Sequence, residues 1–211
     1  MPRPAAGRPS ARDKLLTAAL SVIRAKGYSA TSVDDLCAAA GVTKGAFFHH
    51  FRSKDALAVA AADHWSELTG GLFASATYHS HADPLDRVLG YVDFRRALIA
   101  GELCNFTCLV GTMVQEAYDA HPDIADACGR SIFGHARTLE GDIAEAMDAS
   151  GLTGIDWTAA SLARHTQAVL QGAFILAKAG GGPDVAVEQV DHLKRYITLL
   201  FEARPWEPHP S

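Results

Sequence analysis

The sequence contains few cysteines and no long apolar run. Four Cys in 211 residues are too sparse for the disulfide-rich scaffold of a small secreted domain. Residues 56–62 form an apolar run of seven, far below the roughly 18 residues of a membrane helix. The first ten residues are basic but hold no apolar segment, so they do not resemble a signal peptide. We therefore expect a cytoplasmic chain with no membrane partner.

Motifs of metal sites, nucleotide sites and hydrolases are also lacking. The sequence has no C-x-x-C and no H-E-x-x-H motif. It has no G-x-S-x-G motif, no P-loop and no strand-linked G-x-G-x-x-G motif. The ten histidines are scattered, and His79 with His81 supplies two metal ligands without a recognisable third. These absences predict no metal, no cofactor and no enzymatic activity.

The charge of the chain is unevenly distributed, although its overall composition is ordinary. Apolar residues make up 48% and charged residues 20%, and the net charge is −5, all close to average usage. Residues 1–54, however, carry nine basic and three acidic side chains, for a charge of +6, and the remainder is −11. A short basic module therefore precedes a longer acidic one, which favours a nucleic-acid partner for the first module alone.

Apolar residues recur at helical spacing along most of the chain, and no strand pattern competes with them. The sequence predicts an all-α protein of about nine helices, with a three-helix helix-turn-helix head and a larger helical body. The expected helices are 11–26, 33–40, 44–50, one from 54 with an uncertain end at Gly70-Gly71, 84–100, 105–120, 122–149, 157–179 and 184–203. The expected domains are a flexible basic tail over 1–10, the helix-turn-helix domain over 11–54, the ligand-binding and dimerisation domain over 55–205, and a tail over 206–211.

Two short helices separated by Gly41 are typical of a helix-turn-helix, whose second helix enters the major groove of DNA. Thr43 is expected to cap that second helix, and Phe47 and Phe51 are expected to form the core of the motif. Free N–H groups at helix starts and nearby cations suit phosphates. The expected DNA contacts are Ser32, Thr43, Lys44, Gly45, Ala46, Phe48, His49, His50 and Lys54. Arg3 and Arg8 could follow the minor groove as an arm, although most basic tails are solvated.

The same segment resembles the N-terminal signature of TetR-family transcriptional regulators over about residues 11–60. The resemblance is carried by Gly27-Tyr28, Thr31-Ser32-Val33, Leu36, Ala40-Gly41-Val42-Thr43, Gly45, Phe47-Phe48, His50-Phe51, Ser53-Lys54 and Leu57. Two positions depart from the family pattern: Phe48 stands where Tyr is common, and Ala46 stands where Thr or a similar polar residue is frequent. Polar contacts from both positions are absent, so His49 is expected to carry more of the DNA readout.

The resemblance implies a homodimer that pairs through its last two helices, a palindromic operator and a small-molecule effector. Small residues in helix 157–179 and an apolar stripe in the last helix suit that pairing. Effector contacts are sought among polar or aromatic residues on otherwise buried faces, and ordinary core packing remains the alternative for each. The proposed effector residues are Trp65, Phe94, Cys104, Cys108, Met113, Tyr118, Gln167, Gln171 and Phe174. His135 is a further possibility of the same kind.

The expected function is a ligand-responsive DNA-binding regulator, a repressor that releases its operator when a small molecule binds the body. One alternative is a redox- or metal-responsive regulator, because Cys104 and Cys108 are four residues apart and would share a helical face if their helix begins early enough. A second alternative is a small helical enzyme or carrier that reuses the fold. An activator also remains open.

Overall fold

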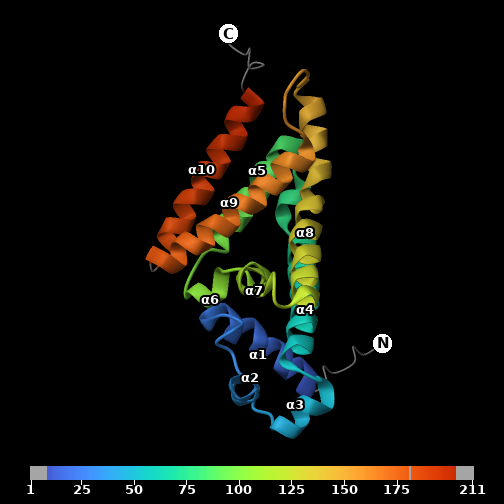
Figure 1. Cartoon of the computed structure of the whole chain (residues 1–211). Coiled ribbons are helices and arrows are strands. Elements are labelled where there is room, and N and C mark those ends of the chain that lie inside the picture. The colour runs from blue at the N-terminus through green and yellow to red at the C-terminus, as the bar shows by residue number, and fades with distance from the viewer. Residues whose placement is uncertain (1–8, 181, 203–211) are drawn as a thin grey trace, which may run out of the picture. The chain divides into compact units, whose positions relative to one another are not determined.

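A computed structural model describes residues 9–180 and 182–202. Over these residues the chain forms ten α-helices and one short 3₁₀ helix, with no strand, which confirms the predicted all-α class (Figure 1). The elements are α1 (Ala11–Lys26), α2 (Val33–Ala40), α3 (Lys44–His50), α4 (Lys54–Ala74), η1 (Thr77–Ser80), α5 (Pro84–Ala97), α6 (Leu103–Phe106), α7 (Leu109–Ala117), α8 (Pro122–Ala149), α9 (Ala159–Gly180) and α10 (Pro183–Glu202). Arg3, Arg8 and the predicted tail 206–211 lie outside the described residues. No helix in the described ranges is long and apolar enough to span a membrane.

The chain divides into two compact units. Unit 1 comprises the described residues up to 67 together with residues 109–128, and unit 2 comprises residues 68–108 and the described residues from 129 onward. Helices α4 and α8 both continue from one unit into the other. Unit 1 thus contains more than the predicted helix-turn-helix domain over 11–54, because the start of α4, all of α7 and the start of α8 belong to it.

In unit 1, α1 packs against α2, α3 and α7. Capping boxes begin both α1 and α2: Ser10 accepts a hydrogen bond from the backbone N–H of Asp13, and Ser32 accepts one from that of Asp35. These caps satisfy N–H groups that a helix start leaves without partners. The core of the unit consists of fully buried apolar side chains, among them Leu15, Ile23, Tyr28, Leu36 and Phe47.

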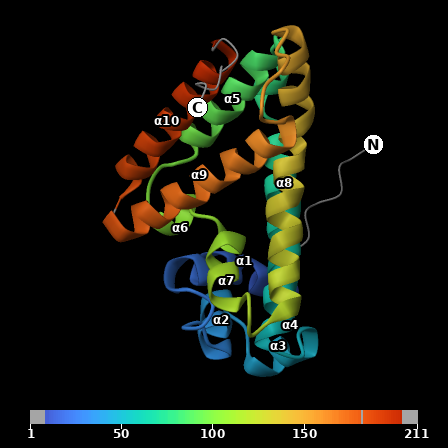
Figure 2. The same ribbon diagram turned by 45° about the horizontal axis from the view of Figure 1, so that its top comes forward.

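In unit 2, α10 lies beside α9 and also packs on α5 (Figure 2). Their buried side chains include Tyr91, Leu170, Val190 and Ile197. The segment after α4 forms η1 (Thr77–Ser80) and buries Tyr78. Gly90 permits this packing, because a Cβ at that position would lie 2.8 Å from the Cβ of Tyr78.

The predicted helix 105–120 is divided, which accounts for ten helices where about nine were expected. Thr107 has extended backbone angles and ends α6 after one turn. Its hydroxyl donates to the carbonyl of Leu103 at 2.8 Å, so the side chain occupies an acceptor of that turn. The glycine pair 70–71, in contrast, does not end the preceding helix, since α4 continues to Ala74.

Candidate nucleic-acid interface and effector residues

The turn between α2 and α3 is built from local hydrogen bonds. Gly41 ends α2 in the left-handed conformation, with φ 64° and ψ 39°, which glycine adopts without steric penalty. The N–H of Val42 then donates to the carbonyl of Cys37 at 3.0 Å. Thr43 begins α3, and its hydroxyl oxygen accepts from the N–H of Ala46 at 3.1 Å. The sequence-predicted break and cap therefore set the direction in which α3 starts.

Helix α3 is attached by one face and exposed on the other. Phe47 is completely buried and Phe51 nearly so, with their ring centroids 6.0 Å apart, which confirms that both belong to the core of the motif. Phe48 is 52% exposed. Ala46 is half-buried, and the exposed residues beside Phe48 are Thr43, Lys44, Gly45, His49 and His50. The structure thus brings most of the predicted DNA contacts together on one solvent-facing helix.

The cations near α3 differ in how firmly they are held. Lys44 forms an ion pair with Asp34 at 2.9 Å, and both side chains are exposed, so the pair contributes little stability and can exchange for a phosphate. Lys26 pairs with Asp35 at 2.7 Å, and this contact together with Ser32 holds the pKa of the Asp35 carboxyl below its usual value. Ser32 therefore acts here as the cap of α2, and its contact with DNA stays a prediction.

Lys54 is directed toward the loop that follows α1. Its ammonium donates to the backbone carbonyl of Tyr28 at 3.0 Å and lies 4.1 Å from the centroid of the Tyr28 ring. The Tyr28 hydroxyl donates to Asp55, and burial raises the pKa of that hydroxyl well above its usual value. Lys54 thus links α4 to the loop, and its predicted phosphate contact remains untested.

A carboxylate to which the sequence assigned no role holds the same loop. Glu116, at the end of α7, accepts hydrogen bonds from the backbone N–H of Ser29 at 2.7 Å and of Tyr28 at 3.3 Å. We call this arrangement the Glu116 clamp. Nearby, His121 Nδ1 lies 3.1 Å from Asp55 Oδ2. Glu116 is almost ninety residues from Tyr28 and Ser29 in the chain, and His121 is 66 residues from Asp55, so no local spacing rule could have predicted these contacts.

The proposed effector residues fall in both units. Trp65, Met113 and Tyr118 lie in unit 1. Met113 is completely buried, and the guanidinium of Arg24 lies 5.0 Å from the centroid of the Trp65 ring. Tyr118 is 72% exposed. The expectation that Tyr118 lies on a buried face was wrong, because α7 ends at Ala117 and Tyr118 follows it at the surface.

The remaining candidates lie in unit 2, and four of them lie on α5 or α9. Gln167 and Phe174 are buried on α9, and Gln171 lies one turn along the same helix, half-buried. Gln167 donates to the hydroxyl of Tyr91 at 3.1 Å. Phe94 on α5 contacts Phe73 edge-on, with ring centroids 5.4 Å apart. These contacts form an aromatic and polar cluster in the core of the unit.

The two cysteines of the redox alternative do not share a helix. Cys104 lies in α6, whereas Cys108 follows the break at Thr107 and precedes α7. Neither forms a disulfide with another described residue, and both have intermediate exposure. The expected common helical face was therefore wrong, although a role for either thiol alone remains a prediction. Across residues 9–180 and 182–202, no group of three His, Cys, Asp or Glu side chains could hold a metal ion, and His79 lies 3.1 Å from the carbonyl of Phe73 instead.

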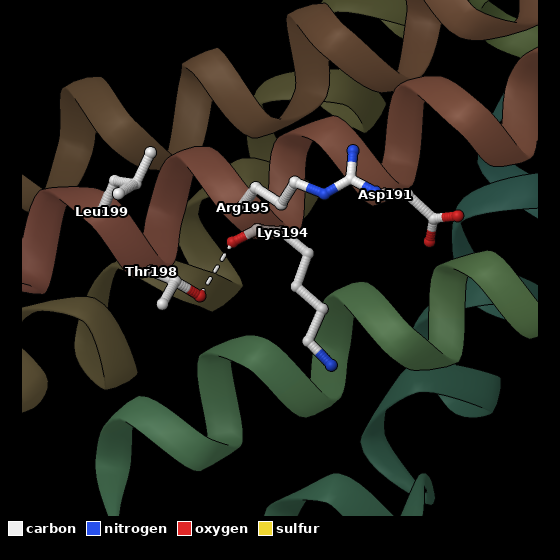
Figure 3. Close-up of a pocket in the computed structure, with 5 residues that line it drawn as sticks. All are labelled: Asp191, Lys194, Arg195, Thr198 and Leu199. Atoms are coloured by element: carbon white, nitrogen blue, oxygen red, sulfur yellow. Dashed lines mark hydrogen bonds between the residues drawn. The ribbon is translucent and has the colours of Figure 1, made fainter.

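A shallow pocket of about 600 Å³ lies along α10, lined by Asp191, Lys194, Arg195, Thr198 and Leu199 (Figure 3). The Lys194 side chain extends toward α5, where its ammonium pairs with Asp93 at 2.7 Å. Asp191 pairs with Arg96 at 2.6 Å, which holds the pKa of its carboxyl below the usual value. Because these charges already have partners, the pocket offers little to an effector.

The capped turn, the buried face of α3 and its exposed face define a helix-turn-helix protein. Residues 15–61 match the model of the family described as bacterial regulatory proteins, tetR family. The transcriptional regulator AcuR of Cereibacter sphaeroides is 31% identical over 115 residues, which cover 54% of this chain but only about half of AcuR, 52%. Residues 15–61 therefore hold the DNA-binding module of the TetR family, and the chain is similar to TetR-family transcriptional regulators.

Two further comparisons extend over nearly the whole chain. An uncharacterized HTH-type transcriptional regulator from Lactococcus lactis is 26% identical over 192 residues, covering 90% of this chain and 95% of that protein. The crystal structure of the regulatory protein TetR from Rhodobacter sphaeroides has a TM-score of 0.77 at 26% identity, covering 88% of this chain and 98% of that one. The family likeness therefore includes the helical body as well as the head.

Proposed function

We propose that this protein is a homodimeric TetR-family repressor that binds a palindromic operator through α3 and releases it when a small molecule binds the helical body. The observation that carries the proposal is the geometry of α3. Buried Phe47 fixes one face of the helix, and the capped N-terminal end with Thr43, Lys44 and Gly45 faces solvent. A recognition helix enters the major groove in this way, with its N-terminal residues toward the bases.

The exposed end of α3 suits contacts with phosphates and base edges. The Thr43 oxygen accepts from Ala46, so its own O–H is left to donate to a phosphate. Gly45 has no side chain, and a Cβ there would meet only the Thr43 hydroxyl, at 3.8 Å, so a DNA backbone can approach closely. His49 and His50 present exposed ring nitrogens, which supply the polar groups that base edges need.

Exposed apolar side chains on the last two helices support the homodimer. Ile175 and Leu176 on α9, and Tyr196 and Leu199 on α10, all lie open to solvent, Leu199 with 62% exposure. Exposed apolar side chains of this kind are found at association sites. A twofold dimer would place two copies of α3 against two half-sites, which accounts for the expected palindrome.

Operator release requires a connection between the body and α3. Helix α4 begins four residues after α3 ends and continues into unit 2. The Glu116 clamp ties α7 to the loop that precedes α2. An effector that favours one arrangement of α4 or α7 by a few kcal/mol would shift the population that can bind DNA.

The test is a gel-shift titration with DNA from upstream of the gene itself and from genomic fragments. We expect salt-sensitive, sequence-specific retention, because neutralised phosphates release counterions. Lys44→Ala should weaken binding and lower the salt slope by about 1. Arg137→Ala removes the same charge from an exposed position in unit 2 and serves as the matched control. Retention of no fragment, or equal loss in both variants, would contradict the proposal.

The dimer is tested by light scattering on the full chain. Leu199→Glu places a charge within the exposed apolar surface of α10 and should convert dimer to monomer, with loss of operator binding. Phe133→Glu, at an exposed apolar residue of α8, is the matched control and should leave the dimer intact. A wild-type chain that is monomeric at assay concentration argues against the homodimer.

A further inference from the structure

The core of unit 2 contains a chain of three polar side chains from three helices. Gln167 of α9 donates to the hydroxyl of Tyr91 on α5 at 3.1 Å, and that hydroxyl lies 2.9 Å from Nε2 of His135 on α8. Tyr91 is almost completely buried and Gln167 is 5% exposed. Because the hydroxyl accepts from Gln167, its proton is free to be donated to His135. The three groups thus satisfy one another.

Arg95, one turn beyond Tyr91 on α5, lies beside these three side chains. Unlike them, it has no hydrogen-bonding partner within the described residues. Its guanidinium is 5.2 Å from the centroid of the Phe73 ring and 5.8 Å from that of Phe174. Within the described ranges, Arg95 has no ion pair and donates no hydrogen bond. Its neighbours on the same helix differ: Arg87 pairs with Asp142 and Glu145, and Arg96 pairs with Asp191. We call Arg95, Phe73, Phe174, Tyr91, His135 and Gln167 the Arg95 cluster.

The electrostatics of the Arg95 cluster favour an anion. Burial lowers the pKa of His135 to about 4, and the positive charge of Arg95 acts in the same direction, so this imidazole is neutral at physiological pH. Burial raises the pKa of the Tyr91 hydroxyl. Arg95 therefore carries the formal charge of the cluster. Besides burial, the charge of Asp142 contributes to raising the pKa of nearby Tyr78, and this carboxylate is already paired with Arg87.

We propose that the Arg95 cluster binds the effector and selects a small organic carboxylate with an apolar or aromatic body. A guanidinium offers parallel N–H donors that match the two oxygens of a carboxylate, and the donors of Arg95 are uncommitted. Phe73 and Phe174 are each 5% exposed and their rings already lie against the guanidinium, so the body of the ligand would enter the core of unit 2 to reach their apolar surface. A half-buried guanidinium held against two rings is less hydrated than one in bulk water, which strengthens its attraction for an anion.

This inference rests on the proposed function, because it names the chemistry of the effector for the same repressor. It includes three residues, His135, Gln167 and Phe174, that the sequence had indicated. The sequence also carried a sign of Arg95 itself. Buried Val88, Tyr91 and Val92 define the inward stripe of α5, and a residue three or four positions further on continues that stripe. Arg95 occupies this position.

The experiment compares carboxylates with their neutral amides on the full chain. Acetate, butyrate, benzoate and phenylacetate are titrated by calorimetry and thermal shift against the corresponding four amides. We expect at least one acid to bind about tenfold or more tightly than its amide, since a charge-assisted pair is absent from the amide. Arg95→Gln should remove this preference, Arg95→Lys should retain part of it, and Arg96→Gln, at the adjacent ion-paired residue, should keep it in full.

Three results would overturn the inference. Acids and amides could bind equally, no acid could bind at all, or Arg95→Gln could keep the acid preference. If Arg95→Gln does not fold, the comparison of acids with amides on wild type and on Arg95→Lys decides the matter. Operator binding is measured on the same samples without ligand. A wild-type chain that binds its operator but shows no acid preference refutes the Arg95 cluster as a carboxylate site, whereas a wild-type chain that shows the acid preference but binds no operator refutes the repressor instead.

Discussion

Gly27 ends α1 with φ 87° and ψ 164°, a backbone conformation that is essentially restricted to glycine. A Cβ at this position would collide with Oε1 of Glu116 and lie 3.1 Å from its Cδ. Gly27→Ala should therefore destabilise unit 1 in two ways. The backbone strain costs about 1–3 kcal/mol. Displacement of the carboxylate, which leaves the N–H groups of Tyr28 and Ser29 without their acceptor, costs about a further 1–3 kcal/mol.

The two contributions are separated by a double-mutant cycle. Urea unfolding followed by circular dichroism is measured for Gly27→Ala, Glu116→Ala and the double variant. The collision is absent once Glu116 is shortened, so Gly27→Ala should then cost only the strain. The coupling between the two substitutions should equal the displacement cost, about 1–3 kcal/mol in magnitude. Gly41→Ala is the matched control, because Gly41 also has positive φ but no atom within 4 Å of its ideal Cβ.

Two results would refute the reasoning. Gly27→Ala could leave the free energy of unfolding within about 0.5 kcal/mol of wild type, the range of unremarkable surface substitutions. Alternatively, it could cost the same with and without Glu116, which would show that the Glu116 clamp does not lie against residue 27. If Gly41→Ala lowers the free energy of unfolding as much as Gly27→Ala does, the whole effect of Gly27→Ala is backbone strain.

Three further predictions concern single residues. Desolvation lowers the pKa of half-buried His135 to about 4, from its usual value of 6.5. The unfolded chain therefore binds more protons between these pH values, and stability should fall by up to about 3 kcal/mol as pH drops through that window. Urea unfolding should show a flatter pH dependence for His135→Phe. Gly141→Ala, at an exposed site of α8 with open space around it, should raise the free energy of unfolding by about 0.5–1 kcal/mol, and a loss would contradict this. Burial raises the pKa of the Cys37 thiol, so iodoacetamide at neutral pH should label Cys104 before Cys37 by mass spectrometry; the reverse order would be inconsistent with the structure.

The head was predictable from sequence because its structure is fixed by contacts between near neighbours. Ser32 and Thr43 each accept a hydrogen bond from an N–H three residues later, and Gly41 supplies the single left-handed residue of the turn. Such interactions depend on spacing alone. The position of Phe47 follows once the helix is placed, since one face must be buried. Which of these residues touches DNA does not follow from spacing and remains a prediction.

The body was less predictable because its breaks and its exposed sites depend on tertiary context. Periodicity continued from 105 to 120, yet the chain leaves the helix at Thr107, where the hydroxyl bonds back to the preceding turn. This division also separated Cys104 from Cys108. Tyr118 continued the apolar pattern, yet it lies beyond the last residue of α7. A hydrophobic period shows where a helix can form, but it does not show where the neighbouring elements allow it to end.

The arginines of α5 show why composition cannot locate a binding group. Arg95 and Arg96 are adjacent and chemically identical, but consecutive residues differ by ~100° around a helix. Arg96 consequently reaches Asp191 on α10, whereas Arg95 lies over the rings of Phe73 and Phe174. One charge is neutralised at the surface, and the other lies beside a polar chain whose members satisfy one another. A count of charges treats Arg95 and Arg96 alike and shows only that the body is acidic overall. The fold distinguishes them: Arg95 forms no carboxylate pair within the described residues, so of these two arginines it is the one that an anionic effector could bind.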